Sequence, residues 1–323
     1  MSHREEKTGK NDNGKKNKGG KRNKIVAIEM IIFVLLIMAA VAIFIQRDKS
    51  VKEAAKIHNQ KAKKTEQTPQ AAQKENEIEE ETEGTEEETG DRDAAVPDRS
   101  NFAVQPGVSV GTTEQSDEKI VYLTLDDGPS DNTQAVLDIL DKYNAKATFF
   151  VTGEMPEYKD MIKAAYDKGH TIGMHTYSHD YAKVYASVDA YFQDLDQIGQ
   201  MVQEEIGYVP CFIRFPGGSS NTVSKKYTAG IMSTLVQEVQ NRGYQYYDWN
   251  GSSGDGSVRT TEELVAQATS FDSNNIILLC HDSHGKQTTV EALPQIIEHY
   301  QSLGYTFKAL DRDSFVAHHG VNN

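Results

Sequence analysis

The stretch YLTLDDGPS (residues 122–130) joins an apolar run to two adjacent aspartates and then to a glycine–proline pair. The apolar part is typical of a buried strand, and Gly128-Pro129 marks the loop that follows it. Asp126 and Asp127 therefore stand at the carboxyl end of a predicted strand. A plain turn with two solvated acids could have the same sequence. The rest of the chain must therefore decide between a turn and a functional pair of carboxylates.

The same order of strand, loop and amphipathic helix recurs along the following sequence. The predicted strands are KIVYLTL (119–125), KATFFV (146–151), HTIGM (170–174), CFIRF (211–215), YQYYDW (244–249), NIILLC (275–280) and YTFKAL (305–310). Apolar residues at spacings of three and four predict helices over residues 133–143, 158–169, 187–207, 224–243, 261–270 and 289–304. Such alternation predicts an α/β fold with a parallel sheet and right-handed crossovers. Seven units can close or nearly close a barrel; a doubly wound open sheet is the alternative.

The first part of the chain has a different composition from the rest. Residues 1–24 carry nine Lys or Arg against three acids and have no core-forming side chains, which predicts a disordered cytoplasmic tail. Residues 25–45 are an apolar run, and about 21 helical residues can cross a hydrocarbon layer of about 30 Å. We therefore predict a transmembrane helix, with the basic flank in the cytoplasm and the rest of the chain outside the cell. A cleaved signal peptide is the alternative.

Residues 46–116 are acidic and contain almost no large apolar side chains, which predicts an extended, disordered linker. Residues 117–323 form the predicted folded domain. This domain has 28 acidic and 15 basic residues, and that sign of net charge argues against nucleic acid as a partner. Its two cysteines, Cys211 and Cys280, lie in apolar runs. They could pair in an exported domain, and two separate buried thiols are the default expectation.

Polar residues follow five of the predicted strands, each time at the carboxyl end. These stretches are DDGPS (126–130), HTYSH (175–179), RFPGGSSN (214–221), DWN (248–250) and HD (281–282). In a parallel α/β sheet or barrel the carboxyl ends of the strands lie at one rim, where active sites form. We therefore expect these side chains to converge.

The two histidines of HTYSH stand four residues apart. On a helical turn or a tight loop, His175 and His179 can face the same way and reach one metal ion. Such a pair is often two unrelated surface histidines, but a carboxylate from a neighbouring loop would complete a catalytic metal site with an open position. Successive residues of an extended segment point to opposite sides. One of Asp126 and Asp127 could then bind the metal while the other takes a proton from water.

The ordered set TLDDGPS, HTYSH, RFPGG, DWN and LLCHD resembles the NodB-homology polysaccharide deacetylases, carbohydrate esterase family four. All five motifs occur in the family's order and cover about residues 120–310. The resemblance implies a distorted (β/α)7 barrel, which agrees with the seven predicted strands. It also implies that the folded domain, residues 117–323, is a deacetylase catalytic domain.

The resemblance implies roles for the residues that match these motifs. Asp127, His175 and His179 would bind a divalent metal, zinc or cobalt. Asp126 would be the general base, and His281 would be the general acid that protonates the departing amine. The implied reaction is amide hydrolysis by an activated water.

Supporting roles are implied in the same way. Arg214 would pair with Asp126, and Asp248 would hold His281 and favour its protonated form.

The remaining implied residues would contact the substrate. The backbone N–H of Gly217 would stabilise the oxyanion, and Trp249 and Leu279 would line the slot for the acetyl methyl group. Family members commonly carry an aromatic or bulky residue where this chain has Gly217, so a more open site is expected here.

The sequence therefore predicts a membrane-anchored, metal-dependent N-deacetylase that acts outside the cell on an amino-sugar polymer. Peptidoglycan N-acetylglucosamine is the expected substrate because the tether holds the domain near the wall; alternatives are chitooligosaccharides, poly-N-acetylglucosamine, N-acetylmuramic acid and acetyl-xylan. A second hypothesis is a catalytically silent wall-binding domain. Two other enzyme classes could use parts of this residue set. A non-heme iron oxygenase uses two histidines and a carboxylate, and a glycosidase could use Asp126 with another carboxylate.

Overall fold

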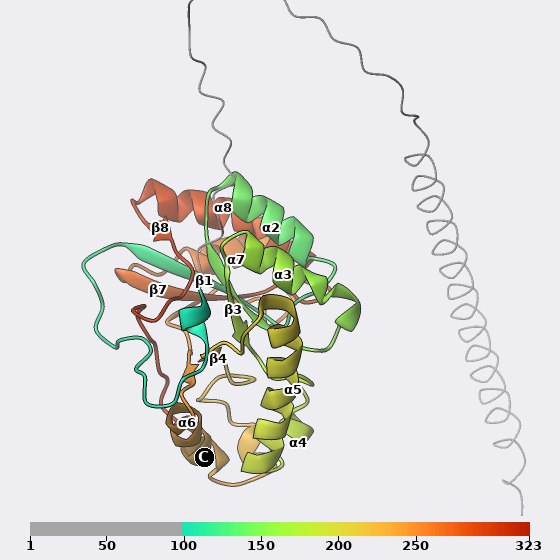
Figure 1. The fold of residues 1–323 in the computed structure, drawn as a ribbon. Coiled ribbons are helices and arrows are strands. Elements are labelled where there is room, and N and C mark those ends of the chain that lie inside the picture. Colours follow the sequence, from blue (N-terminus) through green and yellow to red (C-terminus); the bar gives the residue numbers. More distant parts are fainter. Residues whose placement is uncertain (1–98) are drawn as a thin grey trace, which may run out of the picture. The chain divides into compact units, whose positions relative to one another are not determined.

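The computed structural model describes residues 99–323 (Figure 1). The predicted cytoplasmic tail (1–24), the predicted transmembrane helix (25–45) and the predicted linker as far as residue 98 lie outside the described residues. Within the described part of the chain, no helix combines the length and the apolar character needed to cross a bilayer.

A parallel sheet forms the centre of the domain. Its strands are β1 (Ile120–Asp126), β2 (Ala147–Val151), β3 (Thr171–Met174), β4 (Phe212–Ile213), β5 (Gln245–Tyr246), β6 (Gly251–Ser252), β7 (Asn275–His281) and β8 (Thr306–Phe307). The strand order is β5-β4-β3-β2-β1-β7-β6, and β8 pairs with the beginning of β1. All seven predicted strands are present, and β6 is an addition that the sequence did not predict.

Helices occupy all six segments that apolar periodicity predicts. They are α2 (Thr133–Lys142), α3 (Asp160–Asp167), α5 (Val188–Ile206), α6 (Ile231–Asn241), α7 (Thr261–Ala268) and α8 (Gln287–Ser302), with a short α4 (Tyr181–Val184) before α5. Three 3₁₀ turns complete the set: η1 (Ser100–Phe102), η2 (Pro156–Tyr158) and η3 (Ser224–Lys226). Figure 1 shows α2, α3, α7 and α8 grouped beside β1 and β7.

Alternation along the strands separates two apolar cores. On β1, Leu123 and Leu125 are buried in the large core between the sheet and the helices. Ile120 and Tyr122 belong to a smaller core on the opposite, inner face of the sheet. Because a strand repeats every two residues, Asp126 continues this inner face and is carried to the end of the strand with its carboxylate buried.

The sheet curls, so strands that are far apart in its order approach each other across the inner face. Arg214, which follows β4, donates hydrogen bonds to Thr124 and Asp126 of β1 at 2.8 and 2.7 Å, although β3 and β2 lie between them in the sheet. Within the described residues, β5 and β6 form the two ends of the strand path and do not pair with each other. The fold is therefore a curled, parallel α/β half-barrel. It agrees with the expected distorted (β/α)7 barrel in its curled parallel sheet, but the barrel is not closed. Beside β5, the backbone N–H of Asp248 donates to Ala317 of the carboxyl-terminal segment.

The domain begins earlier than residue 117. Ala103 pairs with Pro210 in an antiparallel bridge, and the backbone N–H of Val104 donates to the Val209 carbonyl at 2.8 Å. Val110 is buried in the inner core. The prediction of a disordered linker up to residue 116 is therefore wrong for this described part. The few apolar side chains of the predicted linker are concentrated there, and burying them anchors the segment.

The two cysteines are separate, buried thiols. Cys280 packs in the large core between the sheet and the helices, and Cys211 packs in the smaller core on the inner face. The sheet therefore lies between them. The default expectation of two unpaired thiols is confirmed.

Candidate active site

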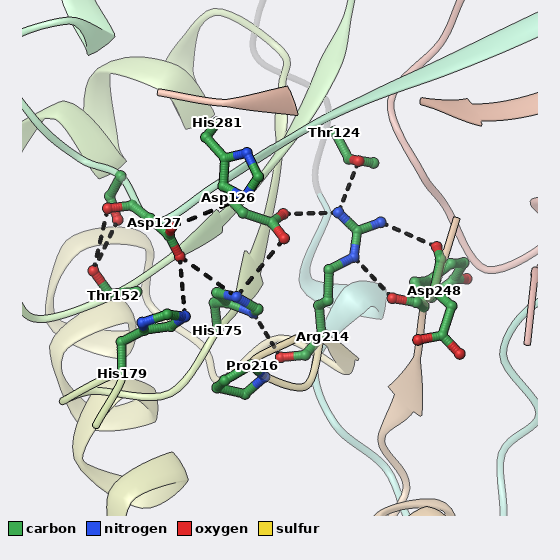
Figure 2. Close-up of polar contacts among 12 residues, drawn as sticks. Thr124, Asp126, Asp127, Thr152, His175, His179, Arg214, Pro216, Asp248 and His281 are labelled. Atoms are coloured by element: carbon green, nitrogen blue, oxygen red, sulfur yellow. Dashed lines mark hydrogen bonds and ion pairs between the residues drawn. The ribbon is translucent and has the colours of Figure 1, made fainter. Parts of the chain in front are cut away.

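The predicted rim is present at the carboxyl ends of the parallel strands. β1 ends at Asp126, β7 ends at His281, and these two residues are register partners across the sheet. β3 ends one residue before His175. Figure 2 shows their side chains converging with those of Asp127 and His179. The expectation that these reactive groups share one site is therefore confirmed.

Asp126 and Asp127 face the same histidine, although strand alternation predicts that they point to opposite sides. Asp127 has φ = 67°, in the left-handed region, so extended geometry ends at Asp126. His175 Nε2 lies 3.7 Å from Asp126 Oδ2 and 3.5 Å from Asp127 Oδ1. The explanation from alternation is therefore wrong: a backbone turn directs both carboxylates to one site.

Asp127, His175 and His179 form a compact set of metal-ligand atoms. The three ligand atoms lie within 4.8 Å of one another. Asp127 Oδ1 is 3.5 Å from His175 Nε2 and 3.4 Å from His179 Nε2. This oxygen is buried and has no hydrogen-bond partner among the described residues, whereas buried polar atoms ordinarily have one. A cation between the three atoms would satisfy the oxygen, so these residues fit a metal site.

The backbone of Arg214 fixes the tautomer of His175. His175 Nδ1 lies 2.8 Å from the Arg214 carbonyl oxygen, which can only accept, so Nδ1 carries the proton. Burial lowers the pKa of His175, although Asp126 and Asp127 favour its charged form. The ring is therefore neutral, and the lone pair of Nε2 faces Asp127 Oδ1, as a metal ligand requires.

A tight loop, not a helical turn, brings the two histidines together. Thr176 and His179 have φ values of 70° and 45°. The loop is held by Asp194 of α5, whose Oδ1 accepts from the backbone N–H groups of Tyr177 and Ser178 at 2.6 and 2.9 Å. Motif reasoning misses Asp194. The sequence feature that could have identified it is an acidic residue on the core-facing side of an amphipathic helix, where a buried charge needs hydrogen-bond partners.

Arg214 is fully buried and connects three strand ends. Nη1 donates to Asp126 Oδ1 at 2.7 Å and to the Thr124 hydroxyl at 2.8 Å. Nε and Nη2 donate to the carbonyl oxygens of Tyr247 and Asp248 at 2.8 and 3.1 Å (Figure 2). The predicted pairing of Arg214 with Asp126 is confirmed, and it leaves the second carboxylate oxygen of Asp126 free of the guanidinium.

His281 is held by Asp255, so the predicted contact between His281 and Asp248 is wrong. His281 Nδ1 lies 2.8 Å from Asp255 Oδ1, and its backbone N–H donates to Asp255 Oδ2 at 2.8 Å. Burial opposes the charged ring, but the hydrogen bond and charge of Asp255, followed by the charges of Asp126 and Asp127, raise the pKa of His281 to about 9. Asp255 lies in the glycine- and serine-rich loop after β6, where no strand pattern marks it.

We expect the substitution Asp255→Asn to lower the pKa of His281 by about one unit or more, because it removes the charge beside Nδ1. Asp248→Asn is the matched control and should leave this pKa nearly unchanged. NMR titration of the histidine ring protons in the metal-free protein measures both effects. Equal shifts in the two variants would contradict the assignment of Asp255 as the partner of His281.

Asp248 instead organises the loop after β4. Its Oδ1 accepts from the Ser219 backbone N–H at 2.8 Å, and its Oδ2 accepts from the Ser219 hydroxyl at 2.5 Å and from the His319 backbone N–H at 2.8 Å. Asp248 is 1% exposed, so these donors are needed to satisfy a buried carboxylate. The residue therefore positions the loop that bears Gly217.

The space beside Gly217 is not open, in contrast to the expectation. Gly217 has φ = 74°, and a Cβ atom at this position would lie 2.6 Å from the hydroxyl oxygen of Tyr181. Its backbone N–H has no hydrogen-bond acceptor within residues 99–323, so it remains available to a ligand.

The two apolar residues expected at the acetyl slot lie near the rim. Leu279 alternates with Cys280 on β7 and shares the inner face with His281. Trp249 is half-buried, with its ring 5.7 Å from the guanidinium carbon of Arg214. Cys280 points into the large core between the sheet and the helices, as alternation predicts.

Comparisons with known proteins identify relatives of this chain in sequence and in fold. Residues 113–236 match a family model described as polysaccharide deacetylase. The chain is 29% identical over 226 residues to a peptidoglycan-N-acetylglucosamine deacetylase of Bacillus cereus, covering 65% of this chain and 78% of that relative.

Two solved structures share both the fold and part of the sequence. The catalytic domain of a peptidoglycan N-acetylglucosamine deacetylase from Eubacterium rectale is 47% identical with a TM-score of 0.63, and the match covers 65% of this chain and 97% of that one. The polysaccharide deacetylase Bc1974 from Bacillus cereus is 30% identical with a TM-score of 0.53, covering 64% and 97%. The chain therefore belongs to the polysaccharide deacetylase family and is a hydrolase.

Proposed function

We propose that the protein is a metal-dependent deacetylase that hydrolyses the acetamide group of N-acetylglucosamine in peptidoglycan. The observation that carries this proposal is the approach of His175 Nε2 and His179 Nε2 to Asp127 Oδ1, a buried oxygen with no hydrogen-bond partner among residues 99–323. The choice of polymer is supported by the relatives from Bacillus cereus and Eubacterium rectale, which are named peptidoglycan N-acetylglucosamine deacetylases.

The ligand set suits a divalent cation such as zinc, with cobalt as a second candidate. One carboxylate and two imidazoles are the kind of donor set found in catalytic zinc sites, which keep a further position for water or substrate. A cation held there would supply a Lewis acid, which would polarise an acyl oxygen and make a nearby water more acidic. Asp127 Oδ1, His175 Nε2 and His179 Nε2 are the atoms proposed to hold it.

Asp126 would take a proton from the attacking water. Arg214 holds its Oδ1 at 2.7 Å, whereas Oδ2 faces the ligand set, 3.7 Å from His175 Nε2. A general base must lie within hydrogen-bond reach of the proton that it removes, so Oδ2, which faces the ligand set, is the oxygen proposed to act as the base. Arg214 therefore acts as a positioning residue for the base.

His281 would protonate the departing amine. Its Nε2 lies 4.0 Å from Asp127 Oδ2, and its Nδ1 is bound by Asp255. As the C–N bond breaks, the charged ring can give its Nε2 proton to the amine nitrogen. Asp255 then orients the ring and stabilises its charge before the transfer, as the carboxylate of a catalytic triad does for its histidine.

Three further residues are proposed to contact the acetyl group. The free N–H of Gly217 would donate to the developing oxyanion. Leu279, on the face of β7 that carries His281, and Trp249, beside Arg214, would surround the methyl group with apolar surface.

Acetate release by the purified full-length protein tests the proposed function. We expect release from peptidoglycan, loss of release after dialysis against a chelator, and recovery on addition of zinc. A protein that binds the wall and releases no acetate from any polymer would instead be the silent binding domain. Faster release from chitooligosaccharides, poly-N-acetylglucosamine, N-acetylmuramic acid or acetyl-xylan would reassign the substrate.

The same assay separates the other enzyme classes. A glycosidase would release reducing ends and survive the chelator, because its two carboxylates need no metal. An oxygenase would depend on oxygen and a reductant.

We expect Asp194→Ala to weaken zinc binding by about 10- to 100-fold, the usual cost of removing a group that orients metal ligands. The reason is that Asp194 holds the backbone between His175 and His179. Asp196→Ala, an exposed acid on the same helix, is the matched control. Competition with a chromophoric chelator measures both affinities, and an unchanged value for Asp194→Ala would show that the loop keeps its shape unaided.

We also propose that residues 25–45 anchor the protein in the cell membrane with the deacetylase domain outside. The full-length protein should remain in the membrane fraction after a carbonate wash, and deletion of 25–45 should release it. A cleaved signal peptide would give a shortened mature chain, which mass spectrometry of the cell-associated protein detects.

A further inference from the structure

Tyr181 fills the space that a side chain at position 217 would occupy. A Cβ atom on Gly217 would lie 2.6 Å from the Tyr181 hydroxyl oxygen and 3.5 Å from ring carbon Cε1. Gly217 is exposed, so this contact lies at the surface of the site and not inside the core. The phenol hydroxyl therefore rests against the backbone whose N–H is free to meet a ligand.

Contacts from both sides fix the Tyr181 ring. It packs edge-on against the ring of His179, with centroids 5.7 Å apart, and against the ring of Tyr185, also at 5.7 Å. The Tyr185 hydroxyl donates to the Pro216 carbonyl oxygen at 2.8 Å, directly before Gly217. Tyr181 thus stands between a proposed metal ligand and the proposed oxyanion donor, with little freedom to turn away.

The hydroxyl of Tyr181 has no hydrogen-bond partner within residues 99–323, although the residue is half-buried. A partly buried tyrosine usually pairs its hydroxyl. The neighbouring Tyr185 does so, through Pro216. Tyr181 instead offers an unused donor beside the free N–H of Gly217.

We propose that Tyr181 is a further catalytic residue, whose hydroxyl donates a hydrogen bond to the acetyl oxygen as it becomes an oxyanion. This inference rests on the proposed deacetylase function and adds a side-chain donor to the backbone donor of Gly217. No proton leaves the phenol. Water adds to the carbonyl carbon and gives one proton to Asp126. The C–N bond then breaks, and the amine takes its proton from His281, while Tyr181 stabilises the negative charge in between.

The substitution Tyr181→Phe tests this role, because it removes the hydroxyl and keeps the ring that packs against His179. Loss of one oxyanion donor typically costs about 10²- to 10³-fold in kcat. We expect kcat for acetate release to fall by about 10²-fold, with KM within about twofold of the wild type. Tyr227→Phe, which removes an exposed hydroxyl on the surface, is the matched control and should keep the wild-type kcat.

Binding of the product acetate gives a second measurement that needs no turnover. Calorimetric titration of the zinc-loaded proteins should show that Tyr181→Phe binds acetate roughly tenfold more weakly, as expected for the loss of a hydrogen bond to a charged oxygen. The zinc content of the variant should equal that of the wild type, because Tyr181 supplies no ligand atom to the set of Asp127, His175 and His179.

The outcomes distinguish this inference from the function on which it rests. A wild-type protein that releases no acetate would overturn both. An active wild type together with a Tyr181→Phe variant of unchanged kcat would overturn the role of Tyr181 alone. A variant with raised KM and unchanged kcat would also overturn it, because the hydroxyl would then contact the bound sugar and not the transition state. Loss of zinc would do the same.

Discussion

Replacing Asp127 with alanine is expected to abolish metal binding and acetate release together. Asp127 Oδ1 is the atom that both imidazoles share, 3.5 Å from His175 Nε2 and 3.4 Å from His179 Nε2. Without it the site retains two imidazole rings and loses the carboxylate of the set. We expect kcat/KM to fall by about 10³-fold or more, because several kcal/mol of transition-state stabilisation depend on the cation.

Asp131→Ala is the matched control for this experiment. Asp131 lies on the same loop, but its carboxylate is exposed and pairs with the ring of His284 at 3.0 Å. Elemental analysis after dialysis gives the zinc content, and acetate release gives kcat/KM. The control should keep both, whereas His175→Ala and His179→Ala should lose both. An inactive Asp127→Ala variant that still holds a full equivalent of zinc would assign Asp127 to the substrate instead of the metal.

The strands were predictable because most of them are runs of buried residues. All seven residues of β1 are buried, as are the first six of β7, and such runs stand out in a sequence. The strand β6 consists of Gly251 and Ser252 and has no apolar or β-branched side chain to mark it. Whether the sheet closes depends on how β4, β5 and β6 pair, and each of these strands has only two residues. Local sequence patterns carry no information about such distant contacts.

The reactive residues of the site were predictable for a different reason. Each lies at the end of a strand or directly after one, so the fold class alone places Asp126, His175 and His281 at one rim. Their partners are set by tertiary structure. Asp255 is 26 residues from His281 and Asp194 is 16 residues from Ser178, with no motif connecting them.

The error over Asp248 shows the same limit. Asp248 lies in the DWN motif, and the family resemblance implied that it would hold His281. The folded chain directs its carboxylate to Ser219 and His319, so it organises a loop. Tyr181 went unnoticed because nothing local indicates that the space beside Gly217 is filled from another segment.

Replacing His281 with alanine is expected to stop turnover and leave the cation bound. His281 is not one of the three residues whose ligand atoms cluster within 4.8 Å, and its Nδ1 is occupied by Asp255. General acid–base groups contribute about 10²- to 10⁴-fold, so we expect kcat to fall by about 10³-fold at full zinc content. His284→Ala, an exposed histidine three residues away, is the matched control and should behave as the wild type.

Asp126→Asn should also stop turnover and leave the cation bound, because it removes the proposed base instead of the proposed acid. The amide oxygen of asparagine can still accept from Arg214, so the buried guanidinium keeps a partner while the base is lost. Added imidazole should partly restore the His281→Ala variant, because it can supply the missing proton donor, and should not restore Asp126→Asn.

Together with Asp127→Ala, these variants separate the tasks of two adjacent carboxylates that face the same histidine. Loss of zinc from Asp126→Asn would make both aspartates ligands and leave the water without a base in the protein. Full turnover by His281→Ala would mean that the amine takes its proton from solvent. The proposed roles require one combination of results: Asp126→Asn and His281→Ala lose turnover but keep zinc, and of these three variants Asp127→Ala alone loses zinc. In that case Asp126 takes the proton of the water, His281 protonates the amine and Asp127 binds the metal.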